Sequence, residues 1–366
     1  MKVSYKKIIT SALALIVFST AAFAKEKNPP KNAELLVRPP LLRLSENGYT
    51  LIWNDNSTDT PVITLQHGKD KQKLTPNRGK VNFKDSGFYI ELTNLEPGEK
   101  YTVKIPKHKN LTFMAPPAPQ DGFTFAAISD HQTIPEKTKI GFKAVKKENP
   151  NCIISAGDML EDGKLKNWAK NFFEKLPIIE GIPFGCAQGN NDTGSGLFSS
   201  FLALDPKYYT TEYSNARFIF LDSNSSFNPT GEQIKWFEQV LKENKSLWTI
   251  VVYHHSSFLS TNPDHSHTRY REVLTELYEK YGVDLVINGH NHLYDRTAPI
   301  NGTVYVTLPT MSSHAPKYDV KHDSPYYAKT VPGFLGYGMF NVSSNKIKGT
   351  IKDLNGKLID TFEILK

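Results

Sequence analysis

The sequence predicts an α/β domain preceded by a small all-β sandwich. Residues 35–117 consist of short β-rich runs separated by turn residues, with no helical periodicity. After Gly122 the pattern changes to strands alternating with helices, which is typical of α/β layers. A proline-rich segment at residues 115–119 lies between the two patterns and predicts a stiff linker. A chain of 366 residues is long enough for both units.

Residues 1–24 are predicted to be a cleavable secretory signal. Three lysines precede a short apolar run at residues 8–18, and small residues flank Phe23 at the spacing that signal peptidases cut. The run is too short to span a bilayer, and no later segment reaches that length. We therefore expect cleavage after Ala24 and a secreted or periplasmic protein without a membrane span; an uncleaved anchor is the alternative.

The expected sandwich follows a polar, proline-containing lead-in at residues 25–34. Its β-rich runs are separated by turn residues such as those at 47–48 and 97–98, which is the spacing of a small sandwich. The clearest runs are residues 50–53, 62–65, 88–92 and 101–105.

The second unit is expected over residues 122–366. Thr230 and Gln233 have the spacing of a capping box, which predicts a helix containing Trp236. The other expected helices are residues 137–148, 168–176 and 270–281. The expected strands are residues 123–128, 152–155, 182–186, 217–221, 247–253 and 285–287, followed by consecutive strands from residue 336 onward.

The net charge and the two cysteines exclude few classes of function. The net charge is +7, and removing the three lysines of the signal leaves +4. The lysines are spread along the chain, which favours solubility and a mild attraction for anions and gives no sign of nucleic-acid specificity. Cys152 and Cys186 each lie in a short apolar run. A disulfide in an exported protein and two buried free thiols are both compatible with that pattern, and the oligomeric state stays open.

Polar residues follow five of the predicted strands. In open α/β sheets, sites form beyond the carboxyl ends of strands. Each of these clusters alone is typical of a turn or cap, but five in succession are hard to explain as turns. The clusters are Asp130 with His131, Gly157 with Asp158, residues 189–192, His254 with His255, and residues 289–292.

The residue types in these clusters indicate a metal site. Carboxylate, amide oxygen and imidazole suit iron, zinc or manganese better than calcium. Asp158 has two oxygens with which to bridge two ions. Two ions about 3.5–4 Å apart clamp a phosphate and activate a bridging hydroxide for in-line attack. The clusters therefore predict a hydrolase of small phosphate esters that uses two divalent or trivalent metal ions.

Four of the five clusters resemble the motifs of the calcineurin-like metallophosphoesterases. The resemblance covers residues 123–366 and implies that superfamily's four-layer αββα sandwich. Residues 289–296 (GHNHLYDR) are especially similar to the purple acid phosphatase branch. Residues 37–41 and 92–101 resemble the fibronectin type III-like sandwich that precedes the catalytic domain in that branch. In that family the small domain mainly packs against the catalytic one.

The resemblance also implies a ligand for each metal position. His254 is preferred to His255 because the family's ligand is the first His of a His-x-Pro stretch, in which Ser256 replaces the proline here. One ion would take Asp130, Asp158 and His292, and the other would take Asp158, Asn190, His254 and His290.

Three positions depart from the family pattern. Gln132 replaces a His or Gly in the first motif, and we expect it to ligate weakly or to leave its position to water. Glu161 replaces the tyrosine that colours purple acid phosphatases, so we do not expect a purple protein. Asn191 replaces a His that contacts phosphate and aids proton transfer. An amide still donates a hydrogen bond to phosphate but cannot shuttle a proton.

The proton donor is expected elsewhere. His265 and His267 lie in the loop after His254, where plant purple acid phosphatases carry histidines that face the substrate. We expect one of the two to protonate the leaving alkoxide; exposed loop histidines are the alternative. His131 and His255 are expected to face the substrate or to support the ligands, with a purely structural role as the alternative.

Three functions fit these observations. The first is a secreted or periplasmic phosphomonoesterase that works by attack of a metal-bound hydroxide. The second is a phosphodiesterase with the same metal pair. The third is a catalytically degenerate metal-binding or adhesion-type protein whose sandwich domain binds carbohydrate or protein. The altered positions Gln132, Glu161 and Asn191 motivate the third, and the otherwise complete ligand set speaks against it.

Overall fold

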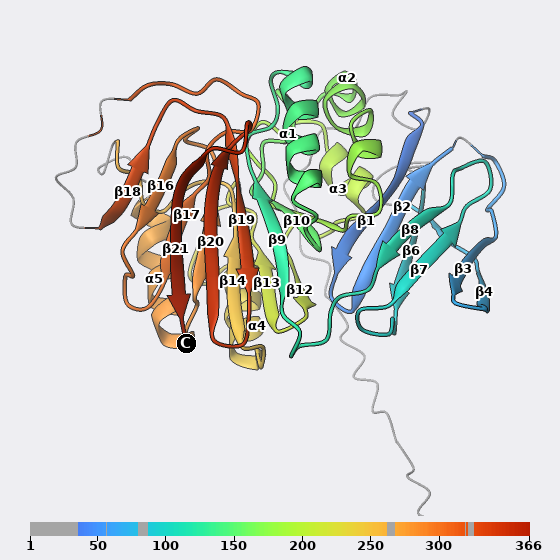
Figure 1. Cartoon of the computed structure of the whole chain (residues 1–366), viewed down its shortest axis with the longest axis horizontal. Coiled ribbons are helices and arrows are strands. Elements are labelled where there is room, and N and C mark those ends of the chain that lie inside the picture. Colours follow the sequence, from blue (N-terminus) through green and yellow to red (C-terminus); the bar gives the residue numbers. More distant parts are fainter. Residues whose placement is uncertain (1–35, 56, 80–86, 262–267, 319, 321–325) are drawn as a thin grey trace, which may run out of the picture.

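The computed structural model describes residues 36–366, except 56, 80–86, 262–267, 319 and 321–325 (Figure 1). Two large β-sheets pack face to face in this part of the chain, and helices cover their outer faces (Figure 1). The core between the sheets is rich in aromatic residues, including Phe125, Phe218 and Phe340. The second unit is thus the four-layer αββα sandwich that the resemblance implies.

The first sheet has ten strands. β9, β10 and β11 run parallel to one another, so their carboxyl ends lie at one edge of the sheet. In spatial order the strands are β21 (Leu358–Leu365), β20 (Lys346–Asp353), β19 (Gly336–Val342), β9 (Phe123–Ile128), β10 (Cys152–Ser155), β11 (Phe184–Cys186), β1 (Arg38–Ser45), β2 (Gly48–Asn54), β6 (Phe88–Thr93) and β5 (Asn77–Arg78).

The second sheet has seven strands. β13, β14 and β15 are parallel, which gathers a second set of carboxyl ends. In spatial order the strands are β12 (Tyr209–Tyr213), β13 (Ala216–Phe220), β14 (Trp248–Val252), β15 (Leu285–Asn288), β17 (Val304–Thr307), β16 (Tyr294–Thr297) and β18 (Tyr327–Val331).

Helices form the two outer layers. Phe142 and Val145 of the first helix pack on the ten-stranded sheet, while Phe237 and Tyr278 pack on the seven-stranded sheet. None of the helices in the described ranges has the length and apolarity that a bilayer crossing needs. The helices are α1 (Pro135–Lys147), α2 (Leu165–Asn167), the π-helix η2 (Trp168–Phe173), the 3₁₀ helix η3 (Leu176–Ile179), α3 (Leu197–Leu202), α4 (Glu232–Glu243) and α5 (Thr268–Tyr281).

The N-terminal strands form a sandwich whose larger sheet continues into the α/β unit. Its smaller sheet consists of β4 (Asp70–Leu74), β3 (Ile63–His67), β7 (Lys100–Lys104) and β8 (Leu111–Met114), in that order. Tyr49 of β2 packs edge-on against Phe113 of β8 across the interior, with ring centroids 5.5 Å apart. β1 pairs in parallel with β11, so one continuous sheet joins the regions on either side of residues 115–119.

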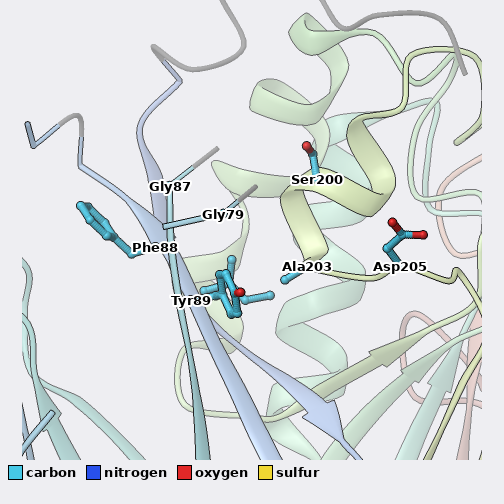
Figure 2. A pocket seen from close by; sticks show the side chains of 8 residues that line it. Gly79, Gly87, Phe88, Tyr89, Ser200, Ala203 and Asp205 are labelled. Atoms are coloured by element: carbon cyan, nitrogen blue, oxygen red, sulfur yellow. The ribbon is translucent and has the colours of Figure 1, made fainter. Parts of the chain in front are cut away.

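A cavity of about 200 Å³ lies at this junction, between the sandwich and α3 (Figure 2). Gly87 and Tyr89 line it from the sandwich side, and Ser200 and Asp205 line it from the side of the α/β unit. No predicted metal ligand is among its described lining residues. The cavity is therefore a feature of the junction and not part of the metal site.

One predicted local structure is wrong, and one predicted helix has an unusual winding. Gln233 does not close a capping box, because its amide is bound to the backbone of Asp222: Oε1 accepts from the Asp222 N–H at 2.7 Å and Nε2 donates to the Asp222 carbonyl at 3.1 Å. The helix begins at Glu232 after Gly231, without a side-chain cap. The helix predicted over 168–176 is a π-helix over much of its length, and that winding brings Trp168 and Phe173 into a stack with centroids 5.6 Å apart.

Cys152 and Cys186 are both buried free thiols. Cys152 faces the core between the two sheets, whereas Cys186 faces the layer under α1 and η2. Side chains on opposite faces of a sheet cannot be joined by a disulfide without moving the backbone. Of the two alternatives that the sequence left open, the structure shows the free thiols.

Candidate metal centre

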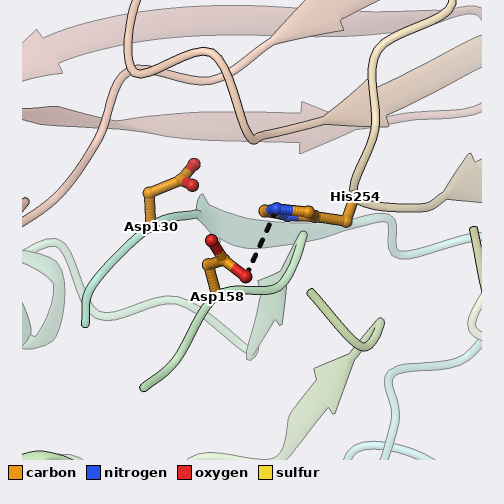
Figure 3. Close-up of side chains that lie close together, drawn as sticks. All are labelled: Asp130, Asp158 and His254. Carbon is orange, nitrogen blue, oxygen red and sulfur yellow. Dashed lines mark ion pairs between the residues drawn. The ribbon is translucent and has the colours of Figure 1, made fainter. Parts of the chain in front are cut away.

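The loops after β9, β10 and β14 bring Asp130, Asp158 and His254 together (Figure 3). One ligand atom from each lies within 4.8 Å of the others, and all three side chains are buried. Because β9 and β10 belong to one sheet and β14 to the other, this cluster sits where the carboxyl ends of both sheets meet.

Asp158 lies at the centre of the cluster. Its Oδ1 is 3.3 Å from His254 Nε2, and the same nitrogen is 3.1 Å from Asn190 Oδ1. Asn191 donates to both oxygens of Asp158, through its backbone N–H at 2.9 Å and its side-chain amide at 2.8 Å. The structure thus brings Asp158, Asn190 and His254 within ligand distance of a common point.

The second half of the cluster is built on Asp130. His292 Nε2 lies 3.3 Å from Asp130 Oδ1, and the backbone N–H of His290 donates to Asp130 Oδ2 at 3.0 Å. The His290 ring lies against the His254 ring, with centroids 5.1 Å apart. Asp130, Asp158 and His254 thus form one group, and the other three predicted ligands each contact a member of it.

Hydrogen bonds fix which ring nitrogen of two histidines faces the cluster. His254 Nδ1 is 2.9 Å from the Ala156 carbonyl, and His292 Nδ1 is 2.7 Å from the His314 carbonyl. A carbonyl only accepts, so Nδ1 carries the proton in both rings and donates it. Each Nε2 therefore faces the carboxylates and is the nitrogen that would bind a metal after releasing the proton that it donates to them, which is the arrangement found in histidines that bind metals.

Four of the predicted ligands have a left-handed backbone, with φ of 51° at Asp130, 52° at Asp158, 72° at His290 and 55° at His292. This region is uncommon for residues other than glycine, and each such conformation costs about 1–3 kcal/mol. Strain of this kind persists where the surrounding structure enforces it and clusters at functional sites. Four such residues in one cluster are typical of a functional site.

Two glycines allow the ligand loops to approach each other. A Cβ on Gly189 would stand 2.1 Å from Asp158 Oδ1, and a Cβ on Gly289 would stand 1.8 Å from Ser129 Oγ. Neither position has room for a side chain. This crowding is the physical reason why Asn190 and His290 each follow a glycine in the sequence.

The carboxylates of the cluster lie in an environment that favours their charged form and the binding of cations. Burial alone would raise the pKa of Asp130, but the hydrogen bond from His292 and the charges of His254 and His292 lower it to about 2. Burial would lower the pKa of His254, but Asp158 and Asp130 raise it to about 9. Gln132 adds a buried Oε1 without a hydrogen-bond partner among the described residues. Carboxylates, imidazoles and an unpaired amide oxygen are a donor set that fits iron, zinc or manganese.

Asp192 supports the site, although no separate role was predicted for it. Its carboxylate is buried and accepts from the backbone N–H groups of Met159 at 2.9 Å, Leu160 at 3.1 Å and Gly189 at 2.8 Å. It thereby joins the loop that carries Asp158 to the loop that carries Asn190. Burial, with the nearby charge of Asp158, raises the pKa of Asp192 to about 7. The only sequence signal was its place at the end of the 189–192 cluster.

Asn224 also supports the 189–192 loop and was missed. Its amide donates to the carbonyls of Gln188 at 3.0 Å and Gly189 at 3.3 Å. It follows β13, a strand without a predicted ligand, and the sequence holds no signal for this contact.

The remaining predicted residues take different places. His131 does not face the cluster: its ring is buried against Phe142, with centroids 5.6 Å apart, and burial lowers its pKa to about 4. His255 stands beside the cluster, with its ring 4.5 Å from that of His290 and its Nδ1 2.8 Å from Ser223 Oγ. His265 and His267 lie outside the described residues. Glu161 is exposed.

Known proteins share both the motifs and the fold. The calcineurin-like phosphoesterase family model matches residues 123–294. The chain is 25% identical, over 85% of its length, to the probable inactive purple acid phosphatase 27 of Arabidopsis thaliana. It is 26% identical, over 69% of its length, to the Fe(3+)-Zn(2+) purple acid phosphatase 12 of the same plant. These matches cover 63% and 65% of the two relatives, so the chain spans a little under two thirds of their length.

A solved structure of purple acid phosphatase PPD1 from yellow lupin (Lupinus luteus) seeds superposes with a TM-score of 0.77, at 16% identity. The superposition covers 90% of this chain and 74% of that one, and at this identity it shows a common fold. Residues 123–294 therefore match the calcineurin-like phosphoesterase family, and the chain is similar in sequence and in fold to purple acid phosphatases.

Proposed function

We propose that the chain is a metal-dependent phosphatase that hydrolyses phosphate monoesters. The observation that carries this proposal is the buried group of Asp130, Asp158 and His254, which the other three predicted ligands contact. In the proposed arrangement one ion is held by Asp130, Asp158 and His292. The other is held by Asp158 together with Asn190, His254 and His290.

The residues around the ligands support this chemistry. A pair of iron, zinc or manganese ions supplies Lewis acidity toward a phosphoryl oxygen and a nucleophile from water near neutral pH. Asn191 holds Asp158 through two hydrogen bonds, so its amide orients a ligand as well as standing near the substrate position. The carbonyls of Ala156 and His314 keep His254 and His292 in the tautomer that metals need.

The leaving group needs a proton from another residue, because an amide at Asn191 cannot supply one. We assign this step to His265 or His267, in the loop that follows His254. His255 lies beside the cluster and is held by Ser223, so it is placed to steady His290. His131 is buried away from the cluster, and we assign it a structural role.

The location and domain proposals come from the sequence. We propose that residues 1–24 are removed on export and that the mature chain begins at Lys25. Residues 35–117 are proposed as a fibronectin type III-like module that packs on the catalytic unit, residues 122–366. The pairing of β1 with β11 supports the idea that the module stabilises the catalytic unit.

The decisive test compares Asp158→Asn with Asp162→Asn in the mature chain. Asp162 is a partly exposed acid in the same loop, bound to Asn167 at 2.6 Å. Asp158→Asn should lose bound metal and at least about 100-fold of the turnover of p-nitrophenyl phosphate, more than removal of a supporting residue costs. Asp162→Asn should keep both. A wild-type protein that binds no metal after reconstitution contradicts the proposal.

A binding protein with a degenerate site is the second candidate. Its support is that two amides, from Gln132 and Asn191, contact Asp158 at positions where the family has other residues. The relative named probable inactive adds to it. Two bound metals without turnover of either p-nitrophenyl phosphate or bis-p-nitrophenyl phosphate would favour this candidate. Preference for the second ester would instead identify a phosphodiesterase.

A further inference from the structure

A cavity of about 400 Å³ lies next to the metal cluster. Its walls come from the start of α1, the segment after β17 and the segment before β19. Thr133, Lys137, Ser313, His314 and Phe334 are among the residues that line it. We call this cavity the Lys137 pocket.

The Lys137 pocket shares a wall with the cluster. His314 lines the pocket, and its backbone carbonyl accepts a hydrogen bond from His292 Nδ1 at 2.7 Å. Thr133 also lines it and directly follows Gln132, whose amide nitrogen is 3.3 Å from Asp158 Oδ2. A phosphate ester held at the cluster would therefore have the pocket beside it.

The pocket is positively charged. None of its described lining residues is acidic, and Lys137 makes no ion pair in the described part of the chain. The neighbouring acid, Glu136, is paired with Lys139 at 3.6 Å. The start of α1, a helix of 13 residues, adds the positive end of its dipole.

A second lysine and two hydroxyls extend this chemistry. Lys317 lies against the pocket wall, since a Cβ on Gly333 would be 3.0 Å from its Cγ. The hydroxyls of Thr133 and Ser313, two residues that line the cavity, are hydrogen-bonded to each other at 2.9 Å, so one of the two hydrogens is left to donate to a ligand. Cations beside hydroxyl donors are what carboxylates and phosphates bind in proteins.

The remaining walls suit the carbon skeleton of an organic ester. Ile134 is 36% exposed at the pocket, and Phe334 is partly buried. A volume of about 400 Å³ is within the range of small-molecule sites, which are largely apolar with a few polar groups that set orientation.

We propose that the Lys137 pocket binds a second anionic group, a carboxylate or a phosphate, on the leaving group of the phosphate ester, with Lys137 as the residue that sets this specificity. The inference rests on the proposed function for the identity of the group held at the metals. It narrows the substrate class to phosphate esters that carry a further negative charge.

The test measures binding as well as turnover, using the mature chain with its metals. Titration calorimetry compares propylphosphonate with 3-phosphonopropionate, which differ only by a methyl in place of a carboxylate. Ethane-1,2-bisphosphonate replaces that carboxylate with a second phosphonate. The proteins are wild type, Lys137→Gln and Lys143→Gln; Lys143 is an exposed lysine on the same helix outside the pocket, so its variant is the charge-matched control.

We expect the wild type to bind at least one of the two probes with a second anionic group about tenfold more tightly than propylphosphonate. A difference of about tenfold is the size of one charged hydrogen bond. The preference should disappear in Lys137→Gln, persist in Lys143→Gln and weaken as salt is raised. The tighter of the two doubly anionic probes identifies the group as a carboxylate or a phosphate. Equal binding of all three probes by the wild type, or a preference that survives in Lys137→Gln, overturns the inference.

Turnover of p-nitrophenyl phosphate by the same wild-type sample separates this inference from the proposed function. Turnover without a preference for the additional anionic group would support the proposed phosphatase and contradict anion binding in the Lys137 pocket. The wild type could instead cleave no ester and still prefer probes with an additional anionic group, with this preference lost in Lys137→Gln. That result would support anion binding in the Lys137 pocket and contradict the proposed catalysis.

Discussion

Asp192 shows how a single buried side chain holds the metal ligands in place. Its two carboxylate oxygens receive three backbone N–H groups from the loops that carry Asp158 and Asn190. An asparagine at this position would have only one accepting oxygen, and its NH₂ group would face a backbone donor. The position of Asn190 relative to Asp158 therefore depends on this carboxylate.

Asp192→Asn should bind metal about 10- to 100-fold more weakly, the usual cost of removing a residue that orients ligands. Competition with a chromogenic chelator measures the affinity, and circular dichroism checks that the fold persists. Asp162→Asn provides the control, because Asp162 is a partly exposed acid that contacts none of the ligands in the described structure. Unchanged affinity in a folded Asp192→Asn protein would show that the ligand loops do not need this support.

Gly289 is a second residue on which the cluster depends, because its position has no room for a side chain. An added methyl would collide with Ser129 Oγ at 1.8 Å and approach Asp130 Oδ2 at 2.8 Å. We expect Gly289→Ala to displace Asp130, to lower metal content below that of the wild type and to reduce turnover at least tenfold.

Gly282→Ala is the matched control for this substitution. Gly282 has a positive φ of 69°, which Gly289 does not, and open space around its Cβ position, so its variant carries backbone strain without a collision. Metal analysis and the melting temperature of both proteins separate the two effects. Full metal content in Gly289→Ala would show that the loops relax around the methyl.

At the residue scale the ligands were predictable, and their supports were not. Asp130, Asp158 and His254 could be found because a polar residue directly after a buried strand is conspicuous in sequence. The direction of a side chain is set by its tertiary neighbours, so sequence could not tell that His131 turns toward Phe142. The contact of the Asn191 amide with Asp158 was hidden for the same reason.

At the scale of elements, β10 and β11 carry the two cysteines to opposite faces of one sheet. The exported location that we propose would expose both thiols to an oxidising environment during folding. Their burial on separate faces nonetheless keeps them apart, and burial raises the pKa of both thiols above the usual range, which makes them poor nucleophiles.

We therefore expect that a reducing agent leaves the melting temperature of the mature protein unchanged. Thiol titration should count two free thiols in denaturant and none in the folded protein. Cys152→Ala and Cys186→Ala should each be destabilised by packing loss alone, to the same extent with and without reductant. A melting temperature that falls on reduction would instead indicate a disulfide.

The elements that sequence predicted best are those with an unbroken apolar run. β14 and β15 are buried at every position, and runs of this kind are typical of parallel strands covered on both faces. β4 was not predicted because its residues are almost all exposed and polar, and it exists through pairing with β3. The capping box at Gln233 failed because a tertiary hydrogen bond to Asp222 outcompeted the local one.

At the scale of the whole molecule, the sandwich and the catalytic unit share a sheet as well as an interface. The proline-rich segment at residues 115–119 predicted a boundary, but sequence could not show that β1 would pair with β11 across it. Pairing between strands so distant along the chain leaves no local pattern. Arg43, in the middle of β1, is the polar residue that joins the two units at this point.

Arg43 is buried, yet its donors are well matched. The guanidinium donates to the carbonyls of Leu202 at 2.8 Å, Leu44 at 2.7 Å and Ala203 at 3.3 Å, and to Thr50 Oγ1 at 2.7 Å. Two of these acceptors belong to the end of α3 and the residue after it, so one side chain connects the sandwich to the catalytic unit. A buried charge is tolerated only when it is paired or hydrogen-bonded in this way.

Arg43→Met keeps much of the side-chain volume but leaves these acceptors without a donor. Each buried unsatisfied acceptor costs about 1–3 kcal/mol, so we expect a loss of about 3 kcal/mol and a melting temperature lower by about 5 °C. Because the two units share a sheet, calorimetry should show one transition for the wild type, and the variant should shift that transition as a whole. Lys100→Met, an exposed substitution in β7, should leave it in place. Two separate transitions in the wild type, with only one moved by Arg43→Met, would mean that the sandwich and the metal-binding unit fold independently despite their common sheet.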